Sequence, residues 1–435
     1  MIESVFRITR KQLDLITSQM AGNEDHKFVP VQCGTGSATI SQKCKRIVWC
    51  AHKILDGNPI SNAAEVIERN CCQCVFTNSL ESLEQLRASD LRVPLWAFIS
   101  CGDIQVFTSS DGLLVPVTVS VVVGHDLLFH FSGENPMIEK HGDTTEFFER
   151  TMQAFGKGTT QYLSQLTIAV AGVSGTGSIV AEQLFRLGVK RLVLIDDDVV
   201  EKRNLGRILN SRVSDAEAAI SKVEMLQKTY QEIGLSTDVI AVPTVIAEPS
   251  TIQLISVCDV IFGCLDSADG RHHLNRISTF YNIPYIDMGV SLVSDNGKIT
   301  DINGAVRYII PGSSSLMSRQ AYSMEQLESD ALRRTNPEAY EARLKEKYIQ
   351  GASESSPAVI SVNMQVASLS VLELLARLHP YRDTPNAQIE TIWVNLFESR
   401  FQIEAPSEPD KSLLKLVGTG DCTPLLNMPS IGGKV

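Results

Sequence analysis

The sequence predicts an α/β protein in which a doubly wound parallel sheet follows an N-terminal α+β domain. Three observations support this prediction. Short apolar stretches of strand length alternate with helical patterns between residues 166 and 289. The first such strand leads through a glycine-rich turn into a helix, and the next strand ends on three aspartates, residues 196–198. Strands that alternate with helices in this way form parallel sheets, so residues 141–406 are expected to form one Rossmann-like domain.

The glycine-rich turn, residues 172–178, lies between a buried strand and a helix. The apolar run 166–171 predicts the strand, and apolar positions at helical spacing over 179–187 predict the helix. Glycines let the backbone approach a phosphate closely, and the N-terminus of the following helix attracts anions. The turn residues expected to bind the nucleotide are Gly172, Ser174, Gly175 and Gly177.

The second strand, 191–195, ends on the acidic cluster. Asp196 and Asp198 lie where a carboxylate binds the ribose of a nucleotide in doubly wound folds. The plain alternative is a glycine turn that only packs a helix on a strand. The acidic strand end that follows the turn favours nucleotide binding.

Composition excludes several other classes of function. The 435 residues exceed the usual size of one domain, and 43% hydrophobic with 20% charged residues is ordinary for a globular protein. A net charge of −11 argues against a nucleic-acid partner, which needs a basic face. No apolar run approaches the ~20 residues of a membrane span, and charges interrupt the N-terminal stretch where a secretory signal is apolar. We therefore expect a cytoplasmic protein whose ten cysteines are thiols.

Residues 1–140 lack the later alternation of strands and helices and are expected to form a separate α+β domain. The expected strands are 6–9, 46–50, 94–99, 114–123 and 127–131, and the expected helix is 11–16. Cys71 and Cys74 make a single C-x-x-C spacing, but no second pair follows. Buried thiols are therefore expected there rather than a zinc site.

Beyond the nucleotide motif, strands and helices continue to alternate up to residue 289, and an antiparallel part follows. A polar helical segment, 142–163, links the domains, and further helices are expected at 215–233, 252–257 and 271–281, with strands at 239–245, 260–264 and 285–289. An antiparallel strand is expected at 299–310, a long apolar helix at 361–378 and a strand at 390–397. Residues 311–355 are expected to form an exposed excursion, and residues 407–435 a flexible tail.

Cationic and amide side chains follow the acidic cluster. Asn204, Arg207 and Lys222 come after the second strand, and Leu265 and Asp266 end a later one. Because parallel strands end at one edge of a sheet, these residues are expected around one crevice. Hydride transfer does not need such cations, whereas a site that holds a triphosphate and releases pyrophosphate does. The Asp266 carboxylate is suited to bind Mg²⁺ beside the phosphates.

With these motifs the chain resembles the ubiquitin-activating enzyme family, which includes the bacterial adenylyltransferases ThiF, MoeB and HesA. The resemblance covers roughly residues 147–397. The matching motifs are Phe148-Glu149-Arg150, the glycine turn, Asp196-x-Asp198, Asn204-x-x-Arg207, Lys222 and Leu265-Asp266-x-x-x-x-Arg271. As a set in this order they are highly specific.

The resemblance implies an enzyme that uses ATP and Mg²⁺ to adenylate the C-terminal glycine carboxylate of a ubiquitin-like protein. The implied roles are ribose binding by Asp196 and Asp198, phosphate binding by Asn204, Arg207 and Lys222, and Mg²⁺ binding by Asp266. Arg150 corresponds to an arginine that reaches the ATP site of a partner subunit, which implies a homodimer. Because the carboxylate is itself the nucleophile, positioning and charge neutralisation are expected to carry catalysis.

The sequence departs from the family pattern in ways that bear on mechanism. Ser174 replaces the usual second glycine of the turn. No cysteine lies between Cys264 and Cys422, so the crossover region holds no thiol. Cys422 is therefore the candidate for a thioester that would pass the activated protein to a conjugating enzyme, although no neighbouring cation would lower its pKa.

Several alternatives stay open. The enzyme could adenylate a sulfur-carrier protein or a peptide carboxylate without forming a thioester. A non-catalytic scaffold is a second alternative, and a nicotinamide-dependent dehydrogenase ranks last. The N-terminal domain has no clear match in the family and is expected to recruit substrate or to support a dimer.

Overall fold

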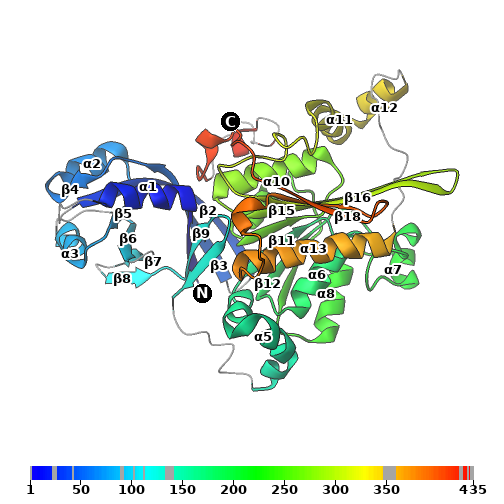
Figure 1. Ribbon diagram of the computed structural model, residues 1–435, viewed down its shortest axis with the longest axis horizontal. Coiled ribbons are helices and arrows are strands. Elements are labelled where there is room, and N and C mark those ends of the chain that lie inside the picture. The colour runs from blue at the N-terminus through cyan, green and yellow to red at the C-terminus, as the bar shows by residue number, and fades with distance from the viewer. Residues whose placement is uncertain are drawn as a thin grey trace.

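The computed structural model describes residues 2–21, 27–41, 44–88, 93–100, 103–110, 113–132, 142–345, 359–420, 425–428 and 431. These residues form two β-sheets, one from each predicted domain, with helices packed around them (Figure 1). Among the helices described, none is both long and apolar enough to cross a bilayer.

The C-terminal sheet is doubly wound and has an antiparallel extension. Its strands lie in the order β13-β12-β11-β14-β15-β16-β17-β18, and the first five pair in parallel. The strands are β11 (Thr167–Ala171), β12 (Arg191–Ile195), β13 (Asp238–Val242), β14 (Val260–Gly263), β15 (Tyr285–Asp295), β16 (Lys298–Ile309), β17 (Thr391–Asn395) and β18 (Arg400–Glu404). Numbered along the chain, the parallel strands have the order 3-2-1-4-5, so the predicted fold class is confirmed. Ligands bind such sheets where the order reverses, here at the carboxyl ends of β11 and β14.

Helices cover both faces of this sheet. They are α5 (Gly142–Leu163), α6 (Gly177–Arg186), α7 (Val213–Glu217), α8 (Lys222–Ile233), α9 (Pro249–Ser256), α10 (Ala268–Tyr281), α11 (Met324–Thr335), α12 (Pro337–Lys345) and α13 (Ile360–Leu378). In Figure 1, α10 lies on one side of the sheet and α6, α8 and α13 lie on the other. Every residue of β11, β12 and β14 is buried, as their continuous apolar runs require.

The helix expected at 215–233 is interrupted. It is formed by α7 and α8, with Ala219 between them in a left-handed conformation at φ 47°. The break places Lys222 in the first turn of α8, close to the loop that leaves β12.

The N-terminal domain is a mixed sheet with the order β10-β9-β1-β3-β2-β5-β6-β7-β8, and β4 pairs with β2. Its strands are β1 (Ile2–Thr9), β2 (Lys27–Ser41), β3 (Cys44–Ile54), β4 (Asn58–Pro59), β5 (Cys74–Thr77), β6 (Leu95–Ser100), β7 (Asp103–Ser110), β8 (Leu113–Pro116), β9 (Val119–Val123) and β10 (Leu127–Phe131). Its helices are α1 (Arg10–Met20), α2 (Ala63–Asn70) and α3 (Leu80–Ala88). The expected strand 114–123 is two strands, because Pro116 cannot donate a ladder hydrogen bond.

Three clusters of buried side chains cover the N-terminal sheet. On one face, α1 packs over a cluster that contains Phe6 and Ile16. On the other face, α2 and α3 cover the half around Trp96. The remaining half of that face, with Val5 and Val48, belongs to the core of the C-terminal domain. The two domains therefore share one hydrophobic core.

Two arginines of the N-terminal domain are fully buried where the domains meet. Arg7 donates to Ser256 O at 2.7 Å and to Tyr281 O at 3.0 Å, at the ends of α9 and α10. Arg46 makes a bidentate pair with Asp259, with N–O distances of 3.1 and 3.2 Å. Because the last carbonyls of a helix lack partners and carry partial negative charge, Arg7 caps both helices.

The N-terminal domain packs at the amino ends of the parallel strands. Asp259 precedes β14 and accepts a hydrogen bond at 2.8 Å from the N–H of Thr167, the first residue of β11. Glu3 pairs at 2.8 Å with Lys190, which precedes β12. Ligands bind at the opposite edge, so this domain lies behind the sheet as seen from the predicted nucleotide site.

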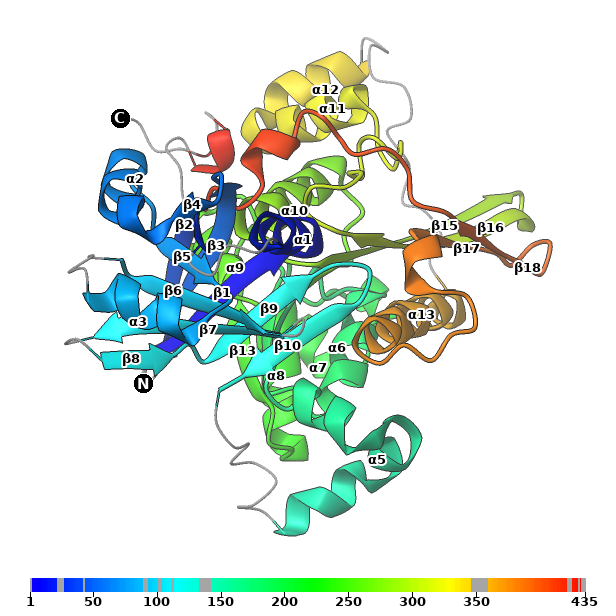
Figure 2. The same ribbon diagram turned by 60° about the vertical axis from the view of Figure 1, so that its left-hand side comes forward.

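The C-terminal segment is packed over residues 407–420, whereas the sequence predicts a flexible tail. The Gly34 N–H donates to Gly418 O at 3.1 Å, and the Gly418 N–H donates to Thr279 O at 3.0 Å. A Cβ on Gly34, Gly418 or Gly420 would overlap neighbouring backbone. Figure 2 shows this segment in red beside α10. The glycines that suggest mobility in the sequence instead allow close packing between the two domains.

We expect Gly418→Ala to loosen this contact. Gly418 has a φ of +70°, and a new Cβ would overlap Ala51 O. Gly297→Ala is the matched control, because Gly297 has a φ of +78° but no atom within 4 Å of a Cβ. The free energy of unfolding, measured with urea, should fall about 2 kcal/mol further for Gly418→Ala than for the control, the scale of an overpacking penalty. Equal losses would show that the close contact contributes nothing.

Part of the predicted exposed excursion is also packed. Leu316 and Tyr322 are buried, and Asp330 of α11 accepts a hydrogen bond at 2.6 Å from the N–H of Ala268, at the start of α10. This stretch therefore packs on α10 as far as α11. Residues 346–358 of the predicted excursion lie outside the described residues.

Candidate active site

The glycine turn between β11 and α6 packs tightly against the turn that follows β14. Gly172 has a φ of +81°, and a Cβ there would lie 2.7 Å from Cys264 O and 3.0 Å from Leu265 Cδ2. A Cβ on Gly177 would overlap the carbonyl oxygen of Gly172. Both positions therefore require glycine, because no side chain fits where the turn folds back on itself.

Lys222 links the glycine turn to the acidic cluster. Its ammonium group donates to Ser174 Oγ at 2.8 Å and to Asp198 Oδ2 at 2.6 Å, and lies 3.5 Å from Asp196 Oδ1. The side chain is 3% exposed. Ser174, which departs from the family pattern, thus supplies the hydroxyl that orients this lysine.

The Asp196 carboxylate joins the glycine turn to the acidic cluster through two hydrogen bonds. Its two oxygens accept hydrogen bonds from Val173 N–H at 2.8 Å and from Asp198 N–H at 3.0 Å. Burial raises the pKa of the Asp196 carboxyl, although Lys222 and these two N–H groups oppose the rise. The Asp198 side chain, by contrast, is 70% exposed, so an incoming ribose can reach it.

Asn204 and Arg207 lie in the loop after β12, and their side chains make different contacts. Asn204 is buried, and its Oδ1 accepts a hydrogen bond from Glu201 N–H at 3.1 Å. Arg207 extends to the glycine turn, where its Cδ would lie 3.4 Å from a Cβ on Gly175. Arg207 is thus placed beside the turn, whereas the Asn204 side chain holds its own loop together.

Leu265 and Asp266 form the turn between β14 and α10. Leu265 packs against Gly172, and Asp266 is exposed at the strand end. Arg271, the last residue of the same motif, donates to Leu265 O at 3.1 Å and pairs with the buried carboxylate of Asp287 at 3.3 Å. Arg271 therefore fixes the backbone of the turn that presents Asp266.

One polar residue at the turn is absent from the predicted set. Asn363 lies in the first turn of α13, and its Nδ2 would overlap a Cβ on Gly175. It is 5% exposed. The stretch 358–367 also holds Ser361 and Gln365, so no signal in the sequence singles out Asn363.

The carboxylates at this edge can be tested for a fit to Mg²⁺. Asp196, Asp197 and Asp198 bring carboxylate oxygens within 4.8 Å of one another, and no other group of three metal ligands this close occurs among the residues described. Asp266 is outside that group. Mg²⁺ usually takes one or two carboxylates together with phosphate oxygens and waters, so a single exposed Asp266 fits an ion that arrives with a nucleotide.

The remaining predicted residues lie away from the turn or outside the described residues. Arg150 is exposed on α5, where it donates to Gln153 Oε1 at 3.3 Å. Cys422 lies outside the described residues. Cys264 ends β14, and burial raises the pKa of its thiol far above the usual range, which makes it a poor nucleophile.

The site as a whole is a polar cluster at the switch point of the sheet. Ser174, Asp196, Asp198 and Lys222 are joined by direct contacts, and Arg207 lies beside Gly175 of the glycine turn. Two helix N-termini, those of α6 and α13, flank the turn. These features define a Rossmann-like α/β protein with an anion-binding edge.

Comparison with known proteins gives the family. The profile of the ThiF family matches residues 148–413, more than half of the chain, so the protein belongs to the ThiF family. It is 27% identical over 166 residues to ubiquitin-like modifier-activating enzyme 5 of Bombyx mori, which covers 36% of this chain and 40% of that protein. It is 28% identical over 134 residues to the adenylyltransferase and sulfurtransferase UBA4 of Meyerozyma guilliermondii, covering 30% and 31% respectively.

The match to these relatives is partial. The chain spans about two fifths of the length of the first curated relatives it matches. Among solved structures, Escherichia coli MccB shares 17% identity at a TM-score of 0.46, covering 63% of this chain and 72% of that one. The family assignment rests on the sequence match and on the fold described above.

Proposed function

We propose that this protein adenylates the C-terminal glycine carboxylate of a ubiquitin-like protein with ATP. A carboxylate oxygen attacks the α-phosphorus, and the bond to the oxygen that bridges toward the β-phosphorus breaks with its electron pair. The products are an acyl-adenylate and pyrophosphate. No proton is transferred, so no general base is required. Membership of the ThiF family and the names of two relatives, a ubiquitin-like modifier-activating enzyme and an adenylyltransferase, support this reaction.

The observation that carries the proposal is the buried Lys222 ammonium at the glycine turn. It lies within hydrogen-bond distance of Ser174 and Asp198. A phosphate bound at the turn would meet this cation, the N-terminus of α6 and the Arg207 side chain. Charge that develops on departing pyrophosphate is stabilised most by cations fixed in a site that excludes water. Asp198 would exchange its lysine partner for a ribose hydroxyl.

Asp266 is the residue we propose to bind Mg²⁺. When bound there, Mg²⁺ neutralises phosphate charge and helps to orient the triphosphate. The protein's own part is positional, because Arg271 holds the Leu265 carbonyl and so fixes the turn. The eight described cysteines are all free thiols, which supports the cytoplasm as the compartment.

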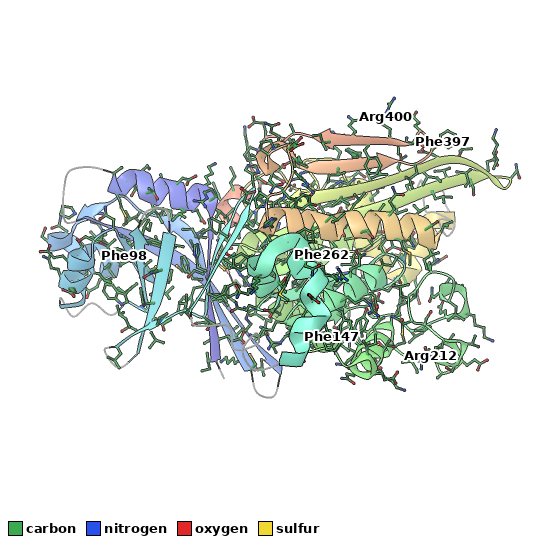
Figure 3. The ribbon with its side chains drawn as sticks, turned by 60° about the horizontal axis from the view of Figure 1, so that its bottom comes forward. Phe98, Phe147, Arg212, Phe262, Phe397 and Arg400 are labelled. Atoms are coloured by element: carbon green, nitrogen blue, oxygen red, sulfur yellow. The ribbon has the colours of Figure 1, made fainter. Side chains whose placement is uncertain are left out.

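The exposure of the Arg150 side chain is the structural observation that supports a homodimer. Arg150 lies on α5 near Phe147, which is 64% exposed and is labelled on that helix in Figure 3. An exposed phenylalanine beside an exposed arginine suits a subunit interface. We propose that a partner subunit covers α5 and receives Arg150 at its own nucleotide site. Analytical ultracentrifugation tests this assembly: a dimer that Arg150→Ala leaves intact but inactive supports the role in the partner's site.

We expect Asp266→Asn to lower ATP–pyrophosphate exchange about tenfold to a hundredfold, in the range seen when a metal site loses a supporting carboxylate. Lost Mg²⁺ affinity should cause the loss, so higher Mg²⁺ concentrations should restore part of it. The assay uses radiolabelled pyrophosphate and a ubiquitin-like protein that ends in glycine. The matched control is Asp383→Asn, an exposed aspartate in the segment that follows α13. Exchange at the wild-type rate by Asp266→Asn would contradict the assigned role.

The same assay separates the alternatives. Exchange with a short peptide, but not with a folded carrier, would replace the ubiquitin-like substrate by a peptide carboxylate. A reducing-agent-sensitive conjugate that disappears in Cys422→Ser would add a thioester step and with it a conjugating enzyme. Exchange without such a conjugate favours activation of a sulfur carrier. Lack of exchange with every carboxylate would indicate a scaffold.

A further inference from the structure

Asn363 is a buried amide placed against the phosphate-binding turn. It is 5% exposed, and α13 carries it between apolar neighbours such as Val362 and Val366. Its Nδ2 lies so close to Gly175 that a side chain there would overlap it, and its Cγ would lie 3.5 Å from the same Cβ. The carboxamide therefore fills the space that a residue larger than glycine would take at the turn.

The Asn363 carboxamide makes no hydrogen bond within the described part of the chain. Its backbone N–H donates to Val359 O at 3.1 Å, as expected in a helix. Neither polar atom of this carboxamide is among the fully buried atoms that lack a partner, so both still reach solvent. A ligand at the turn therefore finds an amide donor that no described residue occupies.

The neighbours of the carboxamide indicate which ligand atoms it meets. Arg207 Cδ and Asn363 Nδ2 approach the same point above Gly175 from two different elements. Lys222 reaches the turn at the preceding residue, through Ser174 Oγ. An anion at the turn would thus lie close to Lys222, Arg207 and the amide.

We infer that Asn363 Nδ2 donates a hydrogen bond to an oxygen bound to the α-phosphorus, at the point where the carboxylate attacks. This inference rests on the proposed adenylation. As the new P–O bond forms, negative charge grows on the oxygens of the α-phosphorus, and a fixed neutral donor stabilises it without a proton transfer. A neutral amide suits this position because it attracts the phosphate without binding the incoming carboxylate as an ion pair.

Two substitutions at position 363 test the donor. Asn363→Ala removes it, and Asn363→Asp keeps the shape but replaces the donor by a negative charge. We expect kcat for pyrophosphate exchange to fall about 100-fold in Asn363→Ala, the usual loss for one transition-state donor, and further in Asn363→Asp. The affinity for Mg·ATP, measured by calorimetry, should stay within about threefold in Asn363→Ala. Met364→Ala, at the adjacent exposed position, is the matched control.

A purely structural role predicts different results. Asn363→Ala leaves a cavity under either role, so some loss of thermal stability is expected in both cases. An amide that only packs leaves kcat per folded molecule unchanged, whereas a donor to the reacting phosphate lowers it. The value of kcat, corrected for the folded fraction seen in a thermal melt, therefore separates the two roles.

A double-mutant cycle with Gly175→Ala gives an independent test. The new methyl group overlaps Asn363 Nδ2 and would push the carboxamide away from the turn. Gly175→Ala should therefore impair exchange in the wild-type background and have little effect in Asn363→Ala, a non-additivity typical of residues in contact. Additive losses would overturn the inference.

The outcomes also separate this inference from the proposed function. If the wild-type protein binds Mg·ATP and catalyses exchange, and both variants at 363 do so equally well, Asn363 has no role in the reaction and the proposed function stands. If the wild-type protein catalyses no exchange with a glycine-ending carrier or a peptide, the proposed function fails and the inference fails with it.

Discussion

Replacing Lys222 by methionine should lower ATP-dependent pyrophosphate exchange about a thousandfold, the upper range for a single charge-stabilising group. Methionine keeps most of the apolar stem of the side chain but removes the ammonium group. That group contacts Ser174 and Asp198 and is 3% exposed. No other ammonium group in the described residues contacts the glycine turn, so a phosphate there would lose its buried cation.

The matched control is Lys228→Met, on the exposed side of the same helix α8. It should exchange at the wild-type rate. Loss of Lys222 also leaves the buried Asp196 carboxylate without its cation, so the pKa of Asp196, already raised by burial, should rise further. The variant should therefore melt at a lower temperature at pH 8 than at pH 6, because the uncompensated carboxylate is charged at the higher pH. A cooperative melt at both pH values shows that the variant is folded and that its lost exchange comes from lost chemistry. A folded Lys222→Met protein that retains a tenth of wild-type exchange would refute the assignment.

Arg46→Met is expected to cause the largest loss of stability, about 3–5 kcal/mol, because it breaks a buried ion pair and leaves a carboxylate uncompensated. Arg46 is 1% exposed and pairs with Asp259, which is 0% exposed, and with Glu3 at 3.1 Å. Asp259 would keep the hydrogen bond from Thr167 N–H but lose its cation. Unfolding in urea, followed by circular dichroism, measures the loss.

Arg10→Ala is the comparison for Arg46→Met. Arg10 pairs with Asp14 at 3.9 Å on the exposed face of α1, and such surface pairs contribute roughly 0–1 kcal/mol. If the two domains unfold together, one transition should shift in Arg46→Met. Two separate transitions in the wild-type protein, with only one shifted by Arg46→Met, would show that the shared core does not couple the domains.

The sequence predicted the doubly wound sheet well because its strands are buried on both faces. Short apolar runs such as 192–195 and 260–264, each followed by a polar or acidic turn, are typical of strands that helices cover on both faces. The N-terminal sheet was predicted in part: 6–9, 46–50, 94–99 and 127–131 correspond to β1, β3, β6 and β10, whereas β2, β5 and β7 were missed. β2, a strand of 15 residues from Lys27 to Ser41, contains Pro30, Gly34 and Gly36, which disfavour a strand in any local reading. Its pairing partners, β3 and β5, stabilise it through contacts that local propensity does not contain.

The site shows the same division between local and tertiary information. The glycine turn and the acidic strand end are adjacent motifs, so spacing alone brought Gly172, Asp196 and their neighbours together. Asn363 comes nearly 200 residues after Gly175, and only the return of α13 over α6 places it there. The position of the Arg271 side chain likewise depends on its ion pair with Asp287, a buried carboxylate on β15.

Helix α10 lies between the turn that holds Asp266 and the contact with the N-terminal domain. Its 14 residues span ~21 Å at the rise of an α-helix. Asp266 lies two residues before the N-terminus of α10. Arg7, Gly418 and Gly420 donate hydrogen bonds to carbonyl oxygens of its last turn. The contacts between the N-terminal domain and α10 therefore lie about one helix length from the turn that presents Asp266.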